Sequence, residues 1–125
     1  MDKTPKTLIV EDNANCRQIL TLYLQQLGHL VIEAEDGTQA IAFAIAERPD
    51  LILMDLGLPG KTGIETAAML RRNSKTSHIP IIALTGWASD ARKQQALSVG
   101  IKVYLVKPAS FETLKKTIED LMKGS

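Results

Sequence analysis

The sequence predicts a doubly wound α/β fold in which five parallel strands alternate with five helices. Two observations support this prediction. Short apolar runs recur along the chain with longer amphipathic segments between them. Two of the runs, at 51–55 and 80–84, are apolar almost throughout, which is typical of strands buried on both faces of a parallel sheet. Strands that alternate with helices need right-handed crossovers, so we expect helices on both faces.

The expected strands are the five short apolar runs, at 7–10, 31–34, 51–55, 80–84 and 103–106. Pro49 and Pro80 mark the starts of the third and fourth strands. The second run contains Glu33, a charged residue among apolar ones. A strand covered on both faces would be apolar throughout, so we expect this second strand at an edge of the sheet.

The expected helices lie between and after these strands and show apolar stripes at helical spacing. The first stripe consists of Cys16, Ile19, Leu20, Tyr23, Leu24 and Leu27, and the last consists of Phe111, Leu114, Ile118 and Leu121. The other helices are expected at 37–47, 63–72 and 88–99. Gly28 and Gly100 stand where glycine commonly ends a helix. The segment 88–99 has a thin apolar stripe, so it should be among the looser elements.

Composition and charge narrow the classes of function. A chain of 125 residues is the usual size of one domain. Its 15 basic and 14 acidic side chains give a net charge of +1, which argues against the broad positive field of a nucleic-acid-binding surface. The single cysteine, Cys16, fits a reducing compartment, and we expect a cytoplasmic protein. The longest apolar run, at 40–46, is far shorter than the about 20 residues that span a bilayer, so no membrane contact is expected.

Polar residues with chemical capability stand at the ends of the expected strands. In doubly wound sheets a ligand binds outside the carboxyl ends of the strands. The residues at those ends are Glu11 and Asp12 after the first strand, Asp55 at the third, Thr85 after the fourth and Lys107 after the fifth. We therefore expect these side chains to form one site.

Three converging carboxylates repel one another, and a hard divalent cation would offset that repulsion. Magnesium prefers oxygen ligands, and we expect Asp12, Asp55 and the backbone carbonyl of Gly57 to bind it directly, with Mn²⁺ as a substitute ion. A carboxylate beside a metal can attack phosphorus, which makes Asp55 the expected nucleophile. Lys107 would neutralise phosphoryl charge, and the Thr85 hydroxyl would donate a hydrogen bond to it.

These residues resemble the receiver domains of two-component response regulators, of the single-domain, chemotaxis type. The resemblance runs from about residue 7 to about residue 122. It rests on five motifs that occur in the order of the family: Glu11-Asp12, Met54-Asp55 with Pro59 and Gly63 after it, Thr85-Gly86, Tyr104, and Lys107-Pro108. It implies a flavodoxin-like sheet in the order 2-1-3-4-5 and one receiver domain over 1–125 without an output domain. Such a domain is either a stand-alone protein or a piece of a larger regulator or hybrid kinase. The stand-alone form is favoured because Met1 lies six residues before the first strand.

The resemblance also implies a function in a phosphorelay. Asp55 would accept a phosphoryl group from a sensor histidine kinase or a histidine phosphotransfer protein, with Glu11 completing the acidic pocket without contacting the metal. Thr85 and Tyr104 would act as switch residues and change the surface of the fourth helix, fifth strand and fifth helix, where a downstream protein binds. Such a chain is a phosphoacceptor switch, not an enzyme acting on other molecules, although it catalyses its own phosphorylation and slow dephosphorylation.

Slow dephosphorylation is expected from two residues at positions where this family varies. Gly57 has no side chain to hold an attacking water in line with the phosphorus, and Trp87 would hinder the approach of water.

Each site residue also has an ordinary structural interpretation. Asp12 or Asn13 could cap the first helix, and Lys107 alone could be a solvated surface residue. Thr85 could be a β-branched residue at a strand end, and Tyr104 could simply cover apolar surface. Their joint placement at the strand ends favours a functional site, because charged groups with perturbed properties gather at such sites.

Two other classes of function remain as alternatives. Gly60-Lys61-Thr62 looks like the end of a phosphate-binding loop of a nucleotide-hydrolysing enzyme, but the first glycine of that motif should stand at position 55, where Asp55 is found. A receiver-like module that never carries phosphate is the other alternative, and the complete acidic pocket argues against it.

The remaining candidate groups are expected to be structural. His29 and His78 lie about 50 residues apart without clustered ligands, so a metal site at either is not expected, and His78 should be a solvated loop residue. Cys16 belongs to an apolar stripe and should be inert packing.

Overall fold

The computed structural model describes residues 4–58, 60, 62–86 and 89–123. Five strands and five helices alternate along the described chain. The strands are β1 (Lys6–Val10), β2 (Leu30–Ala34), β3 (Leu51–Asp55), β4 (Ile81–Thr85) and β5 (Val103–Val106). The helices are α1 (Ala14–Gln26), α2 (Gly37–Glu47), α3 (Gly63–Arg72), α4 (Asp90–Ser98) and α5 (Phe111–Lys123).

All strands are parallel and form one sheet in the order β2-β1-β3-β4-β5. This order confirms both the predicted fold class and the expected edge position of β2. The register aligns the carboxyl ends of the strands, because Asp55 pairs with Leu84 and Thr85 pairs with Val106. The direction of the strand order changes between β1 and β3, so the carboxyl ends of these two strands flank the crevice in which a doubly wound sheet binds its ligand.

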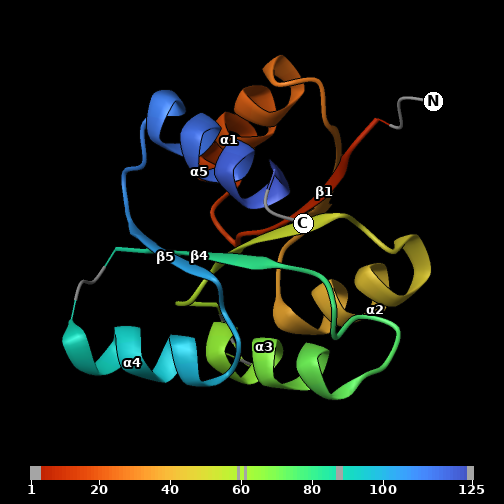
Figure 1. Cartoon of the computed structure of the whole chain (residues 1–125), viewed down its shortest axis with the longest axis vertical. Helices are drawn as coiled ribbons and strands as arrows, with labels where there is room; N and C mark the ends of the chain where they lie inside the picture. Colours follow the sequence, from red (N-terminus) through yellow and green to blue (C-terminus); the bar gives the residue numbers. More distant parts are fainter. Residues whose placement is uncertain (1–3, 59, 61, 87–88, 124–125) are drawn as a thin grey trace.

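Helices cover the sheet on both faces (Figure 1). Helices α1 and α5 lie on one face, and α2, α3 and α4 lie on the other. Alternate residues of the central strands serve the two cores, since Ile9 and Leu53 belong to the α1–α5 side while Val10 and Met54 belong to the opposite side. All residues of β3 and β4 are buried, as their apolar sequences predict. No helix in the described ranges is long and apolar enough to cross a bilayer.

Some element boundaries differ from the expected ones by one or two residues. The fourth strand runs from Ile81 to Thr85 rather than over 80–84, so Thr85 is its last residue and not the residue after it. Helix α4 begins at Asp90 rather than at 88 because the Ser89 side chain caps it, accepting a hydrogen bond from the Arg92 backbone N–H at 3.1 Å. As predicted, Gly28 (φ 89°) and Gly100 (φ 91°) follow the ends of α1 and α4 in the left-handed conformation that glycine adopts without strain.

Candidate functional site

An acidic cluster stands at the carboxyl ends of β1 and β3. Carboxylate oxygens of Glu11, Asp12 and Asp55 lie within 4.8 Å of one another. Glu11 is 1 % exposed and Asp55 is 8 % exposed, whereas Asp12 lies open to solvent. The fold therefore brings together the three carboxylates that the sequence placed at strand ends.

Lys107 reaches this cluster from the end of β5. Its Nζ lies 2.5 Å from Oε1 of Glu11 and 3.5 Å from Oδ2 of Asp55. The Lys107 backbone N–H donates to the carbonyl of Thr85 at 2.7 Å, which joins the ends of β4 and β5. The following peptide bond, Lys107–Pro108, is cis. Thr85 is buried at the end of β4, so the expected cation and hydroxyl residues stand on adjacent strands.

The electrostatics of Lys107 follow from its acidic neighbours. Partial burial by itself lowers the pKa of the ammonium group, because desolvation penalises the charged form. The hydrogen bond with Glu11 and the attraction of Asp55 and Glu11 together outweigh that effect and raise the pKa above its ordinary value. Lys107 is therefore held as a cation between two of the three carboxylates.

The turn after β3 fixes the Asp55 carboxylate. The backbone N–H of Gly57 donates to Oδ1 of Asp55 at 3.1 Å, so one carboxylate oxygen is held by the backbone and the other faces Lys107. The turn folds back closely on α3. A Cβ on Gly63 would lie 2.6 Å from the Leu56 Cα and 2.7 Å from the Asp55 carbonyl oxygen, so glycine permits this approach.

Hydrogen bonds also fix the turn after β1. The Asn13 side chain caps α1, as one of the two expected caps, and the Asn13 backbone N–H donates to Oε2 of Glu11 at 3.1 Å. Arg17 donates from Nη1 to the Glu11 carbonyl at 2.8 Å and from Nε to Oε1 of Glu33 at 3.1 Å.

Neither Glu33 nor Arg17 was expected to take part in the site. Two signals were present in the sequence: a glutamate within the second strand, and an arginine directly beside Cys16 in the apolar stripe of the first helix.

Thr85 and Tyr104 lie on the same side of the sheet. Tyr104 pairs with Ala83 in the register, and Thr85 pairs with Val106. Residues two apart on a strand face the same way, so both side chains are directed toward the face covered by α4. Tyr104 is partly buried and packs against the core of that face. The geometry is compatible with the expected switch pair.

Four residues named in the sequence analysis lie outside the described residues: Met1, Pro59, Lys61 and Trp87.

The donor set of the cluster fits a hard divalent cation. Three carboxyl groups face one ammonium group, so the local charge is not balanced by the described side chains alone. Carboxylate oxygens are the ligands that Mg²⁺ prefers. Within the described part of the chain, this is the sole group of three or more acidic, histidine or cysteine side chains close enough to share an ion.

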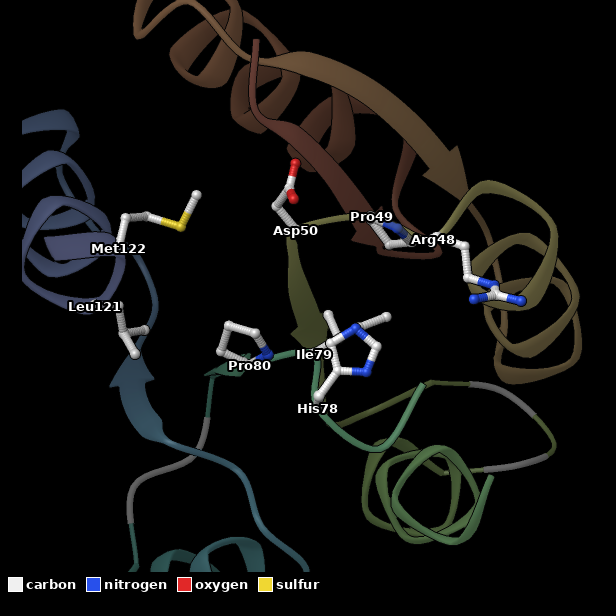
Figure 2. Close-up of a pocket in the computed structure, with 8 residues that line it drawn as sticks. All are labelled: Arg48, Pro49, Asp50, His78, Ile79, Pro80, Leu121 and Met122. Atoms are coloured by element: carbon white, nitrogen blue, oxygen red, sulfur yellow. The ribbon is translucent and has the colours of Figure 1, made fainter. Parts of the chain in front are cut away.

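The histidines stand away from this site. His29 is mostly buried, and its Nδ1 lies 2.8 Å from the Thr7 hydroxyl. His78 is exposed, as expected, at the rim of a hollow of about 430 Å³ at the opposite end of the sheet (Figure 2). In that view the Asp50 carboxylate points away from His78, and it accepts a hydrogen bond from the Lys6 backbone N–H at 2.9 Å.

Cys16 is closer to the acidic cluster than its expected packing role suggests. Burial raises the pKa of its thiol, and a hydrogen bond to Glu11 raises it further. A raised pKa disfavours the reactive thiolate, which agrees with an inert cysteine.

Comparisons with known proteins agree with this geometry. Residues 7–119 match the family model described as the response regulator receiver domain. The chain is 37% identical to the protein PilH of Pseudomonas aeruginosa, over 95% of this chain and 98% of PilH. It covers only about half of several other curated relatives, for example 51% of two of them.

Solved structures show the same likeness. The chemotaxis protein CheY4 of Vibrio cholerae superimposes with a TM-score of 0.90 at 37% identity, covering 94% of this chain and 98% of CheY4. The receiver domain of the sensor histidine kinase PA1611 of Pseudomonas aeruginosa, with a magnesium ion coordinated in its active site cleft, has a TM-score of 0.90 at 32% identity. This match covers 98% of the present chain and 100% of that domain.

Proposed function

The chain belongs to the response regulator receiver family, and on that premise we propose that Asp55 accepts a phosphoryl group from a phosphohistidine of a sensor histidine kinase or a histidine phosphotransfer protein. Receiver domains are the phosphoacceptor switches of two-component signalling. The observation that supports Asp55 as the acceptor is its place in the acidic cluster, where one oxygen is held by the Gly57 N–H and the other lies 3.5 Å from Lys107.

In the proposed step an oxygen of the Asp55 carboxylate attacks phosphorus while the bond from phosphorus to the donor histidine nitrogen breaks. The product is an acyl phosphate on Asp55. The donor histidine reacts with its second ring nitrogen protonated and leaves as neutral imidazole, so no other proton is needed. Phosphoryl transfer depends mainly on positioning and on neutralising charge. The Lys107 ammonium can form an ion pair with the phosphoryl oxygens, and the Thr85 hydroxyl at the end of the adjacent strand can donate a hydrogen bond to one of them.

Magnesium would be held by Asp12, Asp55 and the backbone carbonyl of Gly57, with Mn²⁺ as a substitute. When bound, it supplies positive charge to the phosphoryl oxygens. Glu11 has a different task. Both of its carboxylate oxygens are engaged, one by Lys107 and the other by the Asn13 N–H. Glu11 would therefore orient Lys107 and the turn after β1 without binding the metal itself.

The donor needs a surface beside Asp55 on which to dock. An apolar hollow of about 220 Å³ between α1 and the β5–α5 connection includes Ile19, Leu20, Pro108 and Ala109, and Lys107 lines it as well. It is therefore continuous with the acidic cluster. We propose that a helix of the phosphodonor packs its apolar residues here, which would bring its phosphohistidine to Asp55.

The output surface is proposed to be α4, β5 and α5. Leu97 of α4 and Val106 of β5 are exposed apolar residues on this surface. Among the described residues of α4 only Ala96 is buried, so this helix has few contacts to lose when it moves. The domain would act by binding a downstream protein, without direct contact to nucleic acid or membrane. We place it in the cytoplasm as a single receiver domain, and we expect it to release its phosphoryl group slowly.

Joint binding of Mg²⁺ and beryllofluoride, which stands in for the phosphoryl group, tests this function against a module that never carries phosphate. Calorimetry should show beryllofluoride binding to the wild type only in the presence of Mg²⁺. Asp12→Ala should weaken the binding, and Asp55→Asn should abolish it, because the metal ligand or the acceptor oxygen is lost. Absence of the ternary complex in the wild type would contradict the proposal.

A further inference from the structure

Arg17 joins two elements that flank the acidic cluster. From α1 its Nη1 donates to the backbone carbonyl of Glu11 at 2.8 Å, and its Nε donates to Oε1 of Glu33 on the edge strand β2 at 3.1 Å. Only 16 % of the Arg17 side-chain surface is exposed, whereas about half of the Glu33 side chain is open to solvent. Two nitrogens of one guanidinium are thus held in a fixed orientation.

The place of Arg17 is not one that a cation would favour by itself. Helix α1 begins at Ala14, and the amino end of a helix carries partial positive charge. A mostly buried cation is also costly unless it is paired and hydrogen-bonded. The contacts with Glu11 and Glu33 offset both costs. Packing alone would not require an arginine at this position, so the two contacts point to a further role.

The carbonyl that Arg17 holds belongs to the peptide unit between Glu11 and Asp12. Because a peptide unit is planar, a hydrogen bond to its oxygen sets the orientation of the whole unit from which the Asp12 side chain departs. The Glu11 backbone N–H is also engaged, by the Ala34 carbonyl at 3.0 Å. Both polar groups of the Glu11 backbone are therefore fixed, one by β2 directly and the other by β2 through Arg17.

We propose that Arg17, braced by Glu33, is a positioning residue that orients the Glu11–Asp12 peptide so that the Asp12 carboxylate faces Asp55. The inference rests on the proposed metal-dependent function and adds to it the residue that keeps one metal ligand in place. Groups that orient metal ligands commonly change metal affinity by about 10- to 100-fold when removed.

Charge and position predict opposite results for Arg17→Ala. Through-space electrostatics alone predicts tighter binding of a divalent cation, because a nearby positive charge is removed. Loss of positioning predicts weaker binding, because Asp12 is no longer held toward Asp55. The direction of the change therefore separates the two effects.

The experiment measures Mn²⁺ affinity of the full chain from the paramagnetic resonance signal of the free ion. We expect Arg17→Ala to weaken Mn²⁺ binding about tenfold. Arg17→Lys keeps the charge but cannot make both directional bonds, so it should weaken binding as well. The matched control is Lys6→Ala, which removes a similar bridge at the other end of β1, where Lys6 Nζ lies 3.3 Å from both Oε1 and the carbonyl oxygen of Glu47.

Equal or tighter Mn²⁺ binding by Arg17→Ala would overturn the inference. If that variant does not fold by circular dichroism, Arg17→Lys decides: unchanged affinity overturns the inference and weakened affinity supports it. Weakening of the same size in Lys6→Ala would also overturn it, since the effect would then come from general loosening of the fold. Failure of the proposed function looks different, because the wild type would then bind no Mn²⁺ at the acidic cluster.

Discussion

Gly57 lies directly beside the proposed phosphoacceptor Asp55. Its N–H holds Oδ1 of Asp55, and a Cβ added to it would come no closer to another residue than 3.8 Å, to that same oxygen. A Cβ therefore fits at position 57 without a clash with the residues that the structure describes. With glycine there, no group at this position can hold a water in line with the phosphorus.

Gly57→Asn should accelerate loss of the phosphoryl group. The amide can orient an attacking water, and we expect about tenfold faster hydrolysis, a barrier change near 1.4 kcal/mol. The measurement is the decay of the phosphorylated protein after removal of the phosphodonor. An unchanged half-life would show that groups other than residue 57 control the access of water.

His29 makes the fold sensitive to acid. Burial lowers the pKa of His29 below its ordinary value of 6.5, with Asp50 opposing the shift, because the buried imidazole is favoured in its neutral form. The unfolded chain then binds more protons than the folded one at acidic pH. The stability that comes from this group is fully present above pH 6.5, the ordinary pKa of a histidine, and is lost as the pH falls through the lower pKa of the folded state.

The expected result is a fall in the free energy of unfolding of the wild type between about pH 7.5 and about pH 5.5 that is smaller in His29→Asn. The asparagine amide keeps a partner for the Thr7 hydroxyl but does not titrate. Urea denaturation at the two pH values measures the difference. Identical losses in both proteins would assign the acid sensitivity to other groups.

The members of the candidate site could be predicted from the sequence where they stand at the ends of strands. Asp55, Thr85 and Lys107 end or follow parallel strands, and a parallel sheet brings such positions together. The Arg17–Glu33 bridge could not be predicted in this way. It joins a helix to a strand 16 positions later in the chain, and only the packing of α1 beside β2 brings the two side chains into contact.

At the scale of elements, α3 depends on a glycine to approach the turn after β3. The Gly63 backbone N–H donates to the Leu56 carbonyl at 3.2 Å, and Thr62 and Glu65 form a capping box around it. The start of α3 is thereby fixed against the turn that carries Asp55.

Gly63→Ala should destabilise the protein by about 1–3 kcal/mol, because the added methyl group would meet the backbone of Leu56 and Asp55. The displaced turn should also slow the labelling of Asp55. Gly86→Ala is the matched control, since a Cβ there meets no described residue within 4 Å. Urea unfolding of both variants checks the prediction, and equal stabilities would refute the packing argument.

The elements themselves could be predicted closely because their apolar patterns are clear. Helix α2, helix α3 and strand β3 have the bounds expected from the sequence. The start of α4 was wrong by two residues because the capping hydrogen bond of Ser89, not the apolar stripe, decides where that helix begins.

At the scale of the whole molecule, Thr85 lies between the acidic cluster and the proposed output surface. It ends β4 beside Lys107 and faces the same side of the sheet as Tyr104. Phosphorylation can shift the equilibrium between two states only by as much as one state binds the phosphoryl group better.

Thr85→Ala should therefore still be phosphorylated on Asp55 but should lose most of the change in α4, β5 and α5. Hydrogen exchange of these elements, with and without Mg²⁺ and beryllofluoride, measures that change. If the wild type and Thr85→Ala respond equally, Thr85 is not the coupling residue.

The sheet order brings the acidic cluster close to both the proposed donor surface and the proposed output surface. Strands β1 and β3 hold the carboxylates, while β4 and β5 lead from them to the edge of the sheet beside α4. Sequence pattern alone predicted the alternation of strands and helices. It did not by itself fix the order of the strands, which the resemblance implied and the structure confirms.

Mapping of the phosphorylated residue is the most direct test of the account. The wild type is treated with acetyl phosphate and Mg²⁺, the acyl phosphate is reduced with borohydride, and the modified residue is identified by mass spectrometry of peptides. The account predicts modification of Asp55 alone and no acyl phosphate in Asp55→Asn. Modification of another residue, or equal labelling of Asp55→Asn, would contradict it.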